Sequence, residues 1–158
     1  MTNNQCEICR RIELINQHQN PYFVKELSTG YVVLGDSQYF KGYTLFLCKK
    51  HVTELHFLPR EYQDLFLHEM SLVSEAVANA FKADKMNCEL LGNGDSHVHW
   101  HLFPRHTGDT PRPGPVWWVN PEVMYSLEAQ PNSEQLQVLK MALQTSLDEV
   151  LSKYGGKL

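Results

Sequence analysis

Three histidines alternate with apolar residues in the segment His97-Val98-His99-Trp100-His101. Successive side chains of a β-strand point to opposite faces, so a strand here would place the imidazoles in a row on one face and the apolar side chains in a core on the other. Neighbours in such a row stand about 6 to 7 Å apart. Neutral imidazole can attack phosphorus, bind phosphate or coordinate a metal. Three histidines on one face are hard to satisfy without a ligand, so the row indicates a functional site.

A second group of residues could bind a metal. Cys6 and Cys9 form a Cys-x-x-Cys pair, and His51 and His97 are candidate imidazole partners. Two thiolates and two imidazoles make a closed tetrahedral zinc set, which is typical of a structural site rather than a catalytic one. The spacing alone does not decide between zinc and a thiol pair without metal. A redox role is the rival interpretation, although no thioredoxin-like βαβ pattern surrounds the pair.

Length and composition indicate one globular domain over residues 1–158. Hydrophobic residues make up 42% and charged residues 20%, and no apolar run is long enough for a membrane span. A net charge of −4 with a pI near 6.0 gives no electrostatic case for nucleic-acid binding. The segment from Met1 to Cys6 lacks a basic region followed by an apolar stretch, so we expect no signal peptide. With four cysteines, this favours a cytoplasmic location.

Hydrophobic periodicity predicts strands first and helices later. The predicted strands cover residues 23–27, 31–34, 43–48 and 86–91, followed by the histidine strand. Apolar residues at helical spacing predict one long helix from Arg60 to about Lys82 and a C-terminal helix from Asn132 or Ser133 to Lys153. These elements predict an α+β domain, with an antiparallel sheet of about five strands and one long helix packed on it.

The stretch from Thr107 to Pro131 carries five prolines and predicts a long irregular crossing between the sheet and the last helix. Trp117 and Trp118 lie in its middle. Two adjacent indoles need apolar surroundings, and a dimer partner could supply them.

The segment from His97 to Arg105, read as His-Val-His-Trp-His-Leu-Phe-Pro-Arg, resembles the signature of the histidine-triad (HIT) family of nucleotidyl hydrolases and transferases. The similarity continues in the turn and strand at 41–47, in Lys49-Lys50-His51 and in the helix at 61–81, and it covers about residues 6–106. It implies a HIT-like fold and a homodimer. The ordered Cys-x-x-Cys, Lys-x-His and triad are similar to bacterial members with bound zinc. Leu-Leu-Gly-Asn at 90–93 is typical of the diadenosine-polyphosphate-hydrolase branch.

The resemblance also implies roles for individual residues. His99 matches the nucleophile that attacks the α-phosphorus, and His101 would contact the phosphate oxygens. His56 matches another active-site histidine and could stabilise charge on the transferred group. Asp36 falls at the ribose-binding position. The sequence Gly-Asp-Ser is equally consistent with Asp36 being only a turn residue. Asn93 matches a residue that hydrogen-bonds the scissile oxygen.

The predicted function is hydrolysis of a dinucleoside polyphosphate, such as diadenosine tetraphosphate, through a nucleotidyl-His99 intermediate. A nucleotidyl transferase or phosphoramidase is an alternative, although Gly94 stands where members that cleave phosphoramidates usually carry a serine. Three imidazoles could instead hold a catalytic metal that activates water. A third alternative is a nucleotide-binding regulator without turnover.

Overall fold

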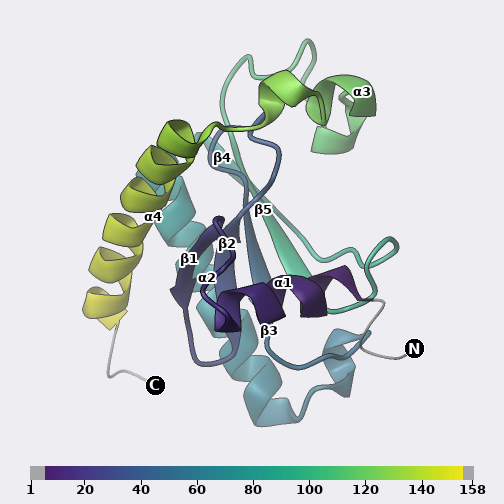
Figure 1. The fold of residues 1–158 in the computed structure, drawn as a ribbon, viewed down its shortest axis with the longest axis vertical. Helices are drawn as coiled ribbons and strands as arrows, with labels where there is room; N and C mark the ends of the chain where they lie inside the picture. The colour runs from purple at the N-terminus through teal and green to yellow at the C-terminus, as the bar shows by residue number, and fades with distance from the viewer. Residues whose placement is uncertain (1–5, 155–158) are drawn as a thin grey trace.

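A computed structural model describes residues 6–154 of the chain. Its centre is a five-stranded sheet in the order β1-β2-β3-β5-β4, and every neighbouring pair is antiparallel (Figure 1). The strands are β1 (Phe23–Glu26), β2 (Gly30–Leu34), β3 (Thr44–Cys48), β4 (Lys85–Glu89) and β5 (His99–Arg105). The helices are α1 (Glu7–Asn16), α2 (Arg60–Phe81), α3 (Pro121–Met124) and α4 (Ser133–Tyr154). The predicted α+β class and the five-stranded antiparallel sheet are confirmed.

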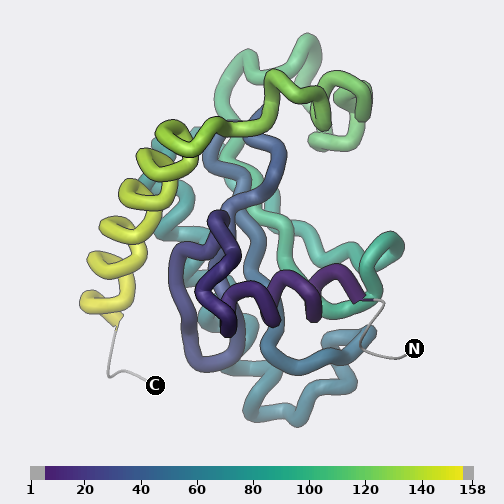
Figure 2. Tube along the Cα trace, in the orientation of Figure 1, coloured from purple at the N-terminus to yellow at the C-terminus, as the bar shows by residue number. Residues whose placement is uncertain are grey.

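Helices α2 and α4 cover one face of the sheet, with α4 running beside α2 and β1 (Figures 1 and 2). Alternate side chains of the strands point into this layer, among them Val32, Phe46 and Leu102, which are fully buried. The helices contribute Phe66 of α2 and Leu143 of α4 to the same core. The apolar stripe predicted for the long helix therefore faces the sheet and α4, as the helical spacing of its apolar residues requires.

A buried carboxylate joins α2 to the first hairpin. Glu69 of α2 accepts hydrogen bonds from the backbone N–H groups of Ser28, at 2.8 Å, and Thr29, at 2.9 Å, and from the Thr29 hydroxyl. These residues form the turn between β1 and β2. The turn's backbone donors are thus satisfied by a side chain of the packed helix, which fixes the helix against the hairpin.

Helix α1 crosses the opposite face of the sheet (Figure 2). Its Ile8 and Ile15 are buried against sheet residues that include Val33, Leu47 and Phe103. The helix begins after Cys6, whose thiol accepts a hydrogen bond from the Cys9 backbone N–H. The sequence pattern did not predict α1. The histidine row lies on this same face of the sheet, so α1 helps to frame it.

The segment after β5 is more ordered than predicted, because it contains α3 and two short 3₁₀ helices at Val116–Trp118 and Leu127–Ala129. The Trp117 ring lies 6.1 Å from the His101 ring and 5.8 Å from that of Phe103. Its indole N–H donates to Glu89 at 2.7 Å. The chain itself therefore supplies packing partners for this indole. No helix within residues 6–154 is long and apolar enough to cross a membrane.

Candidate functional site

His99 and His101 lie on β5, an interior strand of the sheet that pairs with β3 on one side and β4 on the other. His99 pairs with Leu47 of β3, and His101 pairs with Leu45. Val98 and Leu102 point into the core under α2 and α4, so the predicted alternation of faces is confirmed. The rings of His99 and His101 come within 4.7 Å of each other, centroid to centroid. The two imidazole rings are therefore close enough to contact the same small ligand group.

The first histidine of the row lies outside the strand, and the predicted strand start at His97 is wrong. Strand β5 begins at His99 because the preceding residue turns to other partners: the Val98 backbone N–H donates to the Val52 carbonyl at 2.9 Å. The Val98 carbonyl accepts from the Cys48 N–H at 3.2 Å. This irregular backbone carries the buried His97 ring toward the N-terminal cysteines rather than along the row.

His99 is held by its own backbone neighbour. Its Nδ1 lies 2.6 Å from the carbonyl oxygen of His97, and the ring is buried. A carbonyl oxygen only accepts, so Nδ1 carries the hydrogen in this contact. In the neutral ring the lone pair is then on Nε2. The middle histidine is therefore held in the tautomer that a nucleophile needs.

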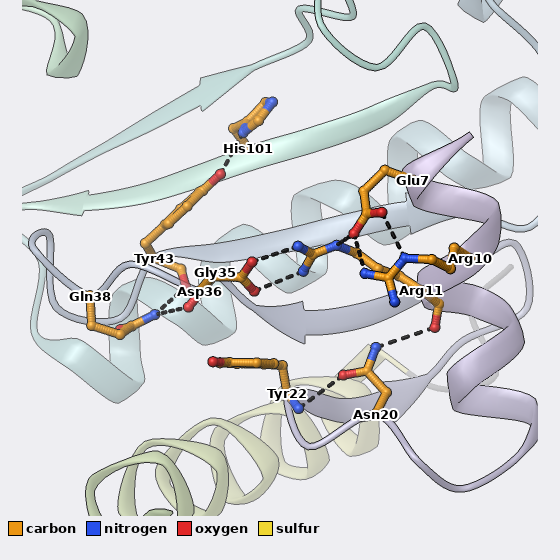
Figure 3. Close-up of polar contacts among 10 residues, drawn as sticks. All are labelled: Glu7, Arg10, Arg11, Asn20, Tyr22, Gly35, Asp36, Gln38, Tyr43 and His101. Atoms are coloured by element: carbon orange, nitrogen blue, oxygen red, sulfur yellow. Dashed lines mark hydrogen bonds and ion pairs between the residues drawn. The ribbon is translucent and has the colours of Figure 1, made fainter. Parts of the chain in front are cut away.

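His101 has a different partner, which the sequence pattern did not identify. Its Nδ1 lies 2.6 Å from the hydroxyl oxygen of Tyr43, which stands just before β3 (Figure 3). Burial, with a smaller effect of the neighbouring His99, lowers the pKa of His101 to about 4. Burial also raises the pKa of the Tyr43 phenol well above its ordinary value. Both groups are therefore uncharged near pH 7.

The four predicted metal ligands come together in one cluster. The ligand atoms of Cys6, Cys9, His51 and His97 all lie within 4.8 Å of one another. The Cys9 sulfur is 3.2 Å from Nδ1 of His51 and 3.4 Å from Nδ1 of His97, and the Cys6 sulfur is 3.6 Å from the latter. Tetrahedral zinc with ordinary bond lengths separates sulfur and nitrogen ligands by about 3.6 Å. The residues present therefore fit a zinc ion.

The protein around the cluster also suits a cation. Nε2 of His97 lies 2.8 Å from the Cys48 carbonyl oxygen and donates to it, so the Nδ1 lone pair faces the thiols. A backbone carbonyl in this position orients a metal-ligating histidine and raises its basicity. Burial raises the pKa of the Cys9 thiol to about 11, with further contributions from Cys6. A bound cation would displace that thiol proton.

Asp36 has a strong partner on α1. In the bend after β2, its two carboxylate oxygens accept from Arg11, with Nη1 to Oδ1 at 2.8 Å and Nη2 to Oδ2 at 2.5 Å (Figure 3). Arg11 also donates to Glu7 at 3.0 Å. Asp36 remains exposed. Nothing in the sequence pattern linked Arg11 to this carboxylate.

The other two candidate residues, His56 and Asn93, lie on exposed segments of the chain. His56 is exposed on the 3₁₀ helix Leu55–Phe57, with its ring 4.6 Å from that of Phe57. Asn93 lies in the exposed loop between β4 and β5. A small cavity of about 60 Å³ is bordered by residues next to both of them and by His99. Neither His56 nor Asn93 contacts the His99 ring among the described interactions, and only their chain neighbours Leu55 and Gly92 share this cavity with His99.

Comparison with known proteins gives consistent matches. The HIT domain model matches residues 21–108, which is more than half of the chain. A histidine triad protein from Marinobacter aquaeolei is 30% identical, with a TM-score of 0.67 over 81% of this chain and 89% of the other. One from Bradyrhizobium japonicum is 26% identical, with a TM-score of 0.67 over 79% of this chain and 89% of the other.

A Zn-bound histidine triad family protein from Mycobacterium smegmatis shares the fold at 21% identity, with a TM-score of 0.62 over 93% of this chain and 98% of the other. A comparison with curated protein sequences found no match. The family match, the 30% identical structure and the histidine row on β5 agree with one another. The chain therefore belongs to the HIT domain family and has the HIT-like α+β fold.

Proposed function

We propose that this protein is a nucleotidyl hydrolase that cleaves dinucleoside polyphosphates of the diadenosine tetraphosphate type through a covalent nucleotidyl-histidine intermediate. The proposal depends chiefly on one contact, the 2.6 Å hydrogen bond from Nδ1 of His99 to the His97 carbonyl. That bond leaves the Nε2 lone pair available to attack phosphorus. The HIT family of nucleotidyl hydrolases and transferases supplies the class of reaction.

In the first step, Nε2 of His99 attacks the α-phosphorus and forms a P–N bond. The bond from phosphorus to the bridging oxygen breaks, and the leaving nucleotide takes the electron pair. His101, 4.7 Å away ring to ring, would stabilise the negative charge on the phosphate oxygens. A nucleotide leaving group has a low pKa and departs with little help from a general acid.

In the second step, water attacks the same phosphorus and the P–N bond breaks. A nucleoside monophosphate leaves, the proton of the water is lost to solvent, and the neutral His99 ring is restored with its Nδ1–H still on the His97 carbonyl. Splitting the reaction in this way replaces one difficult displacement by two easier ones.

Other residues have proposed supporting roles. Asp36 would accept hydrogen bonds from the ribose hydroxyls, and Arg11 holds its carboxylate in place. Asn93 would hydrogen-bond the scissile oxygen from its exposed loop. His56 would donate to the transferred group from its position on the 3₁₀ helix next to the cavity at His99.

Zinc would occupy the cluster of Cys6, Cys9, His51 and His97, where it would cross-link the N-terminal end of α1, the segment after β3 and the segment just before β5. Four protein ligands leave no open position, which suits a structural ion. We also propose a homodimer: β4 is an edge strand of the described sheet, and an edge strand offers unpaired backbone groups to a second chain. Size-exclusion chromatography with light scattering would test this assembly, and the mass of a monomer would refute it.

The geometry gives less support to a catalytic metal held by all three histidines of the row. The Nδ1 atoms of the three histidines contact three different groups. Nδ1 of His97 contacts the thiols, that of His99 contacts a backbone carbonyl, and that of His101 contacts the Tyr43 hydroxyl. They do not converge on one point. The covalent mechanism is compatible with all three contacts as they stand.

The decisive experiment is an alkaline quench of the protein mixed with radiolabelled diadenosine tetraphosphate. A phosphorus–nitrogen bond to imidazole survives alkali and is labile in acid. Label should therefore be recovered on a peptide containing His99, and it should accumulate in a His101→Ala variant that slows the second step. Turnover with no adduct in either protein would refute the covalent mechanism. Binding of the nucleotide without turnover would favour a regulator, and release of an amine from a phosphoramidate would favour a phosphoramidase.

A further inference from the structure

We propose that Tyr43 is a positioning residue that fixes His101 in the tautomer with hydrogen on Nε2, so that His99 and His101 are held in opposite tautomers. The inference rests on the proposed function in taking His101 as the group that meets the phosphate. It adds a residue outside the histidine row and gives it a defined role. The argument depends on which partner donates in the contact between the Tyr43 hydroxyl and Nδ1 of His101.

Tyr43 is the donor in this hydrogen bond. A phenol O–H is a strong donor and a weak acceptor, whereas the lone pair of a neutral imidazole nitrogen is a strong acceptor. The phenol keeps its proton because burial raises its pKa. The imidazole is neutral at pH 7 because burial lowers its pKa to about 4. A neutral ring that accepts at Nδ1 must carry its hydrogen on Nε2.

The surrounding chain is built to hold the Tyr43 ring in one place. The ring stacks on that of Phe103, with 4.1 Å between centroids and 7° between planes. A Cβ atom on Gly35 would lie 2.2 Å from Cδ1 of Tyr43, so only glycine leaves room for the ring. The Tyr43 carbonyl accepts from Gly35, at 2.9 Å, and from the Gln38 side chain, at 3.0 Å (Figure 3). The hydroxyl is thus aimed at His101 by packing and by backbone hydrogen bonds.

The consequence is a pair of imidazoles with complementary chemistry. His99 donates through Nδ1 to a carbonyl and presents a lone pair on Nε2. His101 accepts through Nδ1 and presents an N–H on Nε2. A phosphoryl group placed between them meets one nucleophile and one hydrogen-bond donor. If both rings had the same tautomer as His99, two lone pairs would face the negatively charged oxygens, and one of them would repel the substrate.

The direct test is nuclear magnetic resonance of the full-length protein labelled with nitrogen-15 in histidine, as purified, at pH 7. Nitrogen shifts distinguish a protonated ring nitrogen from one with a lone pair, and the His101 signals are identified by their loss in His101→Gln. We expect a protonated Nε2 at His101 and a protonated Nδ1 at His99. A protonated Nδ1 at His101 in the wild-type protein would overturn the proposal, and this measurement needs no Tyr43 variant to fold.

The Tyr43→Phe variant keeps the stacking on Phe103 and removes only the hydroxyl. We expect His101 to lose its fixed tautomer and kcat to fall about tenfold to a hundredfold, with KM within about threefold, because the buried Nδ1 loses its donor. Tyr31→Phe is the matched control, since Tyr31 is buried on the same face of the sheet. It should change neither the His101 spectrum nor kcat.

A double-mutant cycle separates positioning from a general structural effect. If Tyr43 acts through His101, Tyr43→Phe should cause no further loss of kcat in a His101→Ala background. Additive losses would overturn the proposal. The absence of any adduct or turnover in a wild-type protein with the expected spectrum would instead count against the proposed hydrolase, and would leave the role of Tyr43 in setting the tautomer supported.

Discussion

Arg11 of α1 donates two parallel hydrogen bonds to Asp36 in the bend after β2, from Nη1 to Oδ1 at 2.8 Å and from Nη2 to Oδ2 at 2.5 Å. Such a fork fixes the orientation of a carboxylate as well as its position. Cys6, the N-cap of the same helix, belongs to the candidate metal cluster. Helix α1 therefore connects the cluster to the carboxylate proposed to bind ribose, which leads to the first prediction.

Replacing Arg11 with alanine should weaken nucleotide binding by about fivefold to tenfold, because the Asp36 carboxylate loses its preorganised position. The free energy of unfolding should change by less than about 1 kcal/mol, since the ion pair is partly exposed. Isothermal titration with a nucleoside monophosphate measures the affinity. Arg10→Ala is the control, because Arg10 pairs with Glu7 on the same helix. Equal effects of the two substitutions would show that Asp36 is a turn residue only.

The His99→Ala substitution should lower turnover by roughly three to six orders of magnitude, the range for loss of a covalent nucleophile. Nucleotide affinity should stay within about tenfold, because the phosphate and ribose contacts remain. Steady-state kinetics and a binding titration check both parts. His68→Ala on α2 is the control and should retain full activity. Residual activity above about a tenth of the wild-type value would contradict the assignment of the nucleophile.

Elemental analysis should find about one zinc ion per chain. Cys9→Ser should remove it and lower the free energy of unfolding by about 3 kcal/mol, which corresponds to about 10 °C in Tm. Cys88→Ser is the matched control, because Cys88 is an exposed thiol on β4 that contacts Ser74. Calorimetry with and without a chelator measures the effect. Metal-free protein of unchanged stability would leave the cysteines as a plain thiol pair.

The lowered pKa of His101 predicts a pH-dependent stability. Burial, with a smaller effect of His99, shifts this pKa from 6.5 to about 4 in the folded protein. The groups that face His101 are the ring of His99, the hydroxyl of Tyr43 and the cross-strand partner of His101, Glu89. Between these two pH values the unfolded chain binds a proton that the folded chain does not. The folded state therefore loses stability as pH falls from 6.5 toward 4, and the contribution is constant above about pH 7.

Urea titrations at pH 7.5 and 4.5 measure this contribution. The wild-type protein should lose about 2 kcal/mol more than His101→Gln between the two values. Acid release of metal and protonation of carboxylates affect both proteins alike, so the difference isolates His101. Equal losses in the two proteins would show that His101 is protonated near its ordinary pKa.

Local sequence periodicity predicted those parts of the structure that depend on local pattern. The alternation around His99 placed the imidazoles on one face, and the spacing of Phe66 and Val77 gave the buried stripe of α2. The metal cluster followed from ligand chemistry, although its members are far apart in the chain. Helix α1 was missed because it has only ten residues and is capped by a cysteine, which is an unusual N-cap.

The two positioning contacts could not be predicted in this way. Tyr43 and His101 are 58 residues apart, and Arg11 and Asp36 are 25 apart. Neither pair has a periodic signal, because each meets only once the sheet has formed and α1 has packed across it. The prediction that the strand starts at His97 was wrong for a related reason. The backbone of Val98 forms hydrogen bonds with Val52 and Cys48, and no local pattern in the sequence indicates these distant partners.

His97 belongs to two assemblies at once. Its ring faces the thiols of Cys6 and Cys9, and its carbonyl oxygen accepts the hydrogen of His99. Ring and carbonyl are parts of one residue in a buried stretch of backbone, so they cannot drift independently. Oxidation of the thiols, or loss of an ion bound to them, would therefore displace the carbonyl acceptor that fixes the tautomer of His99, the proposed nucleophile.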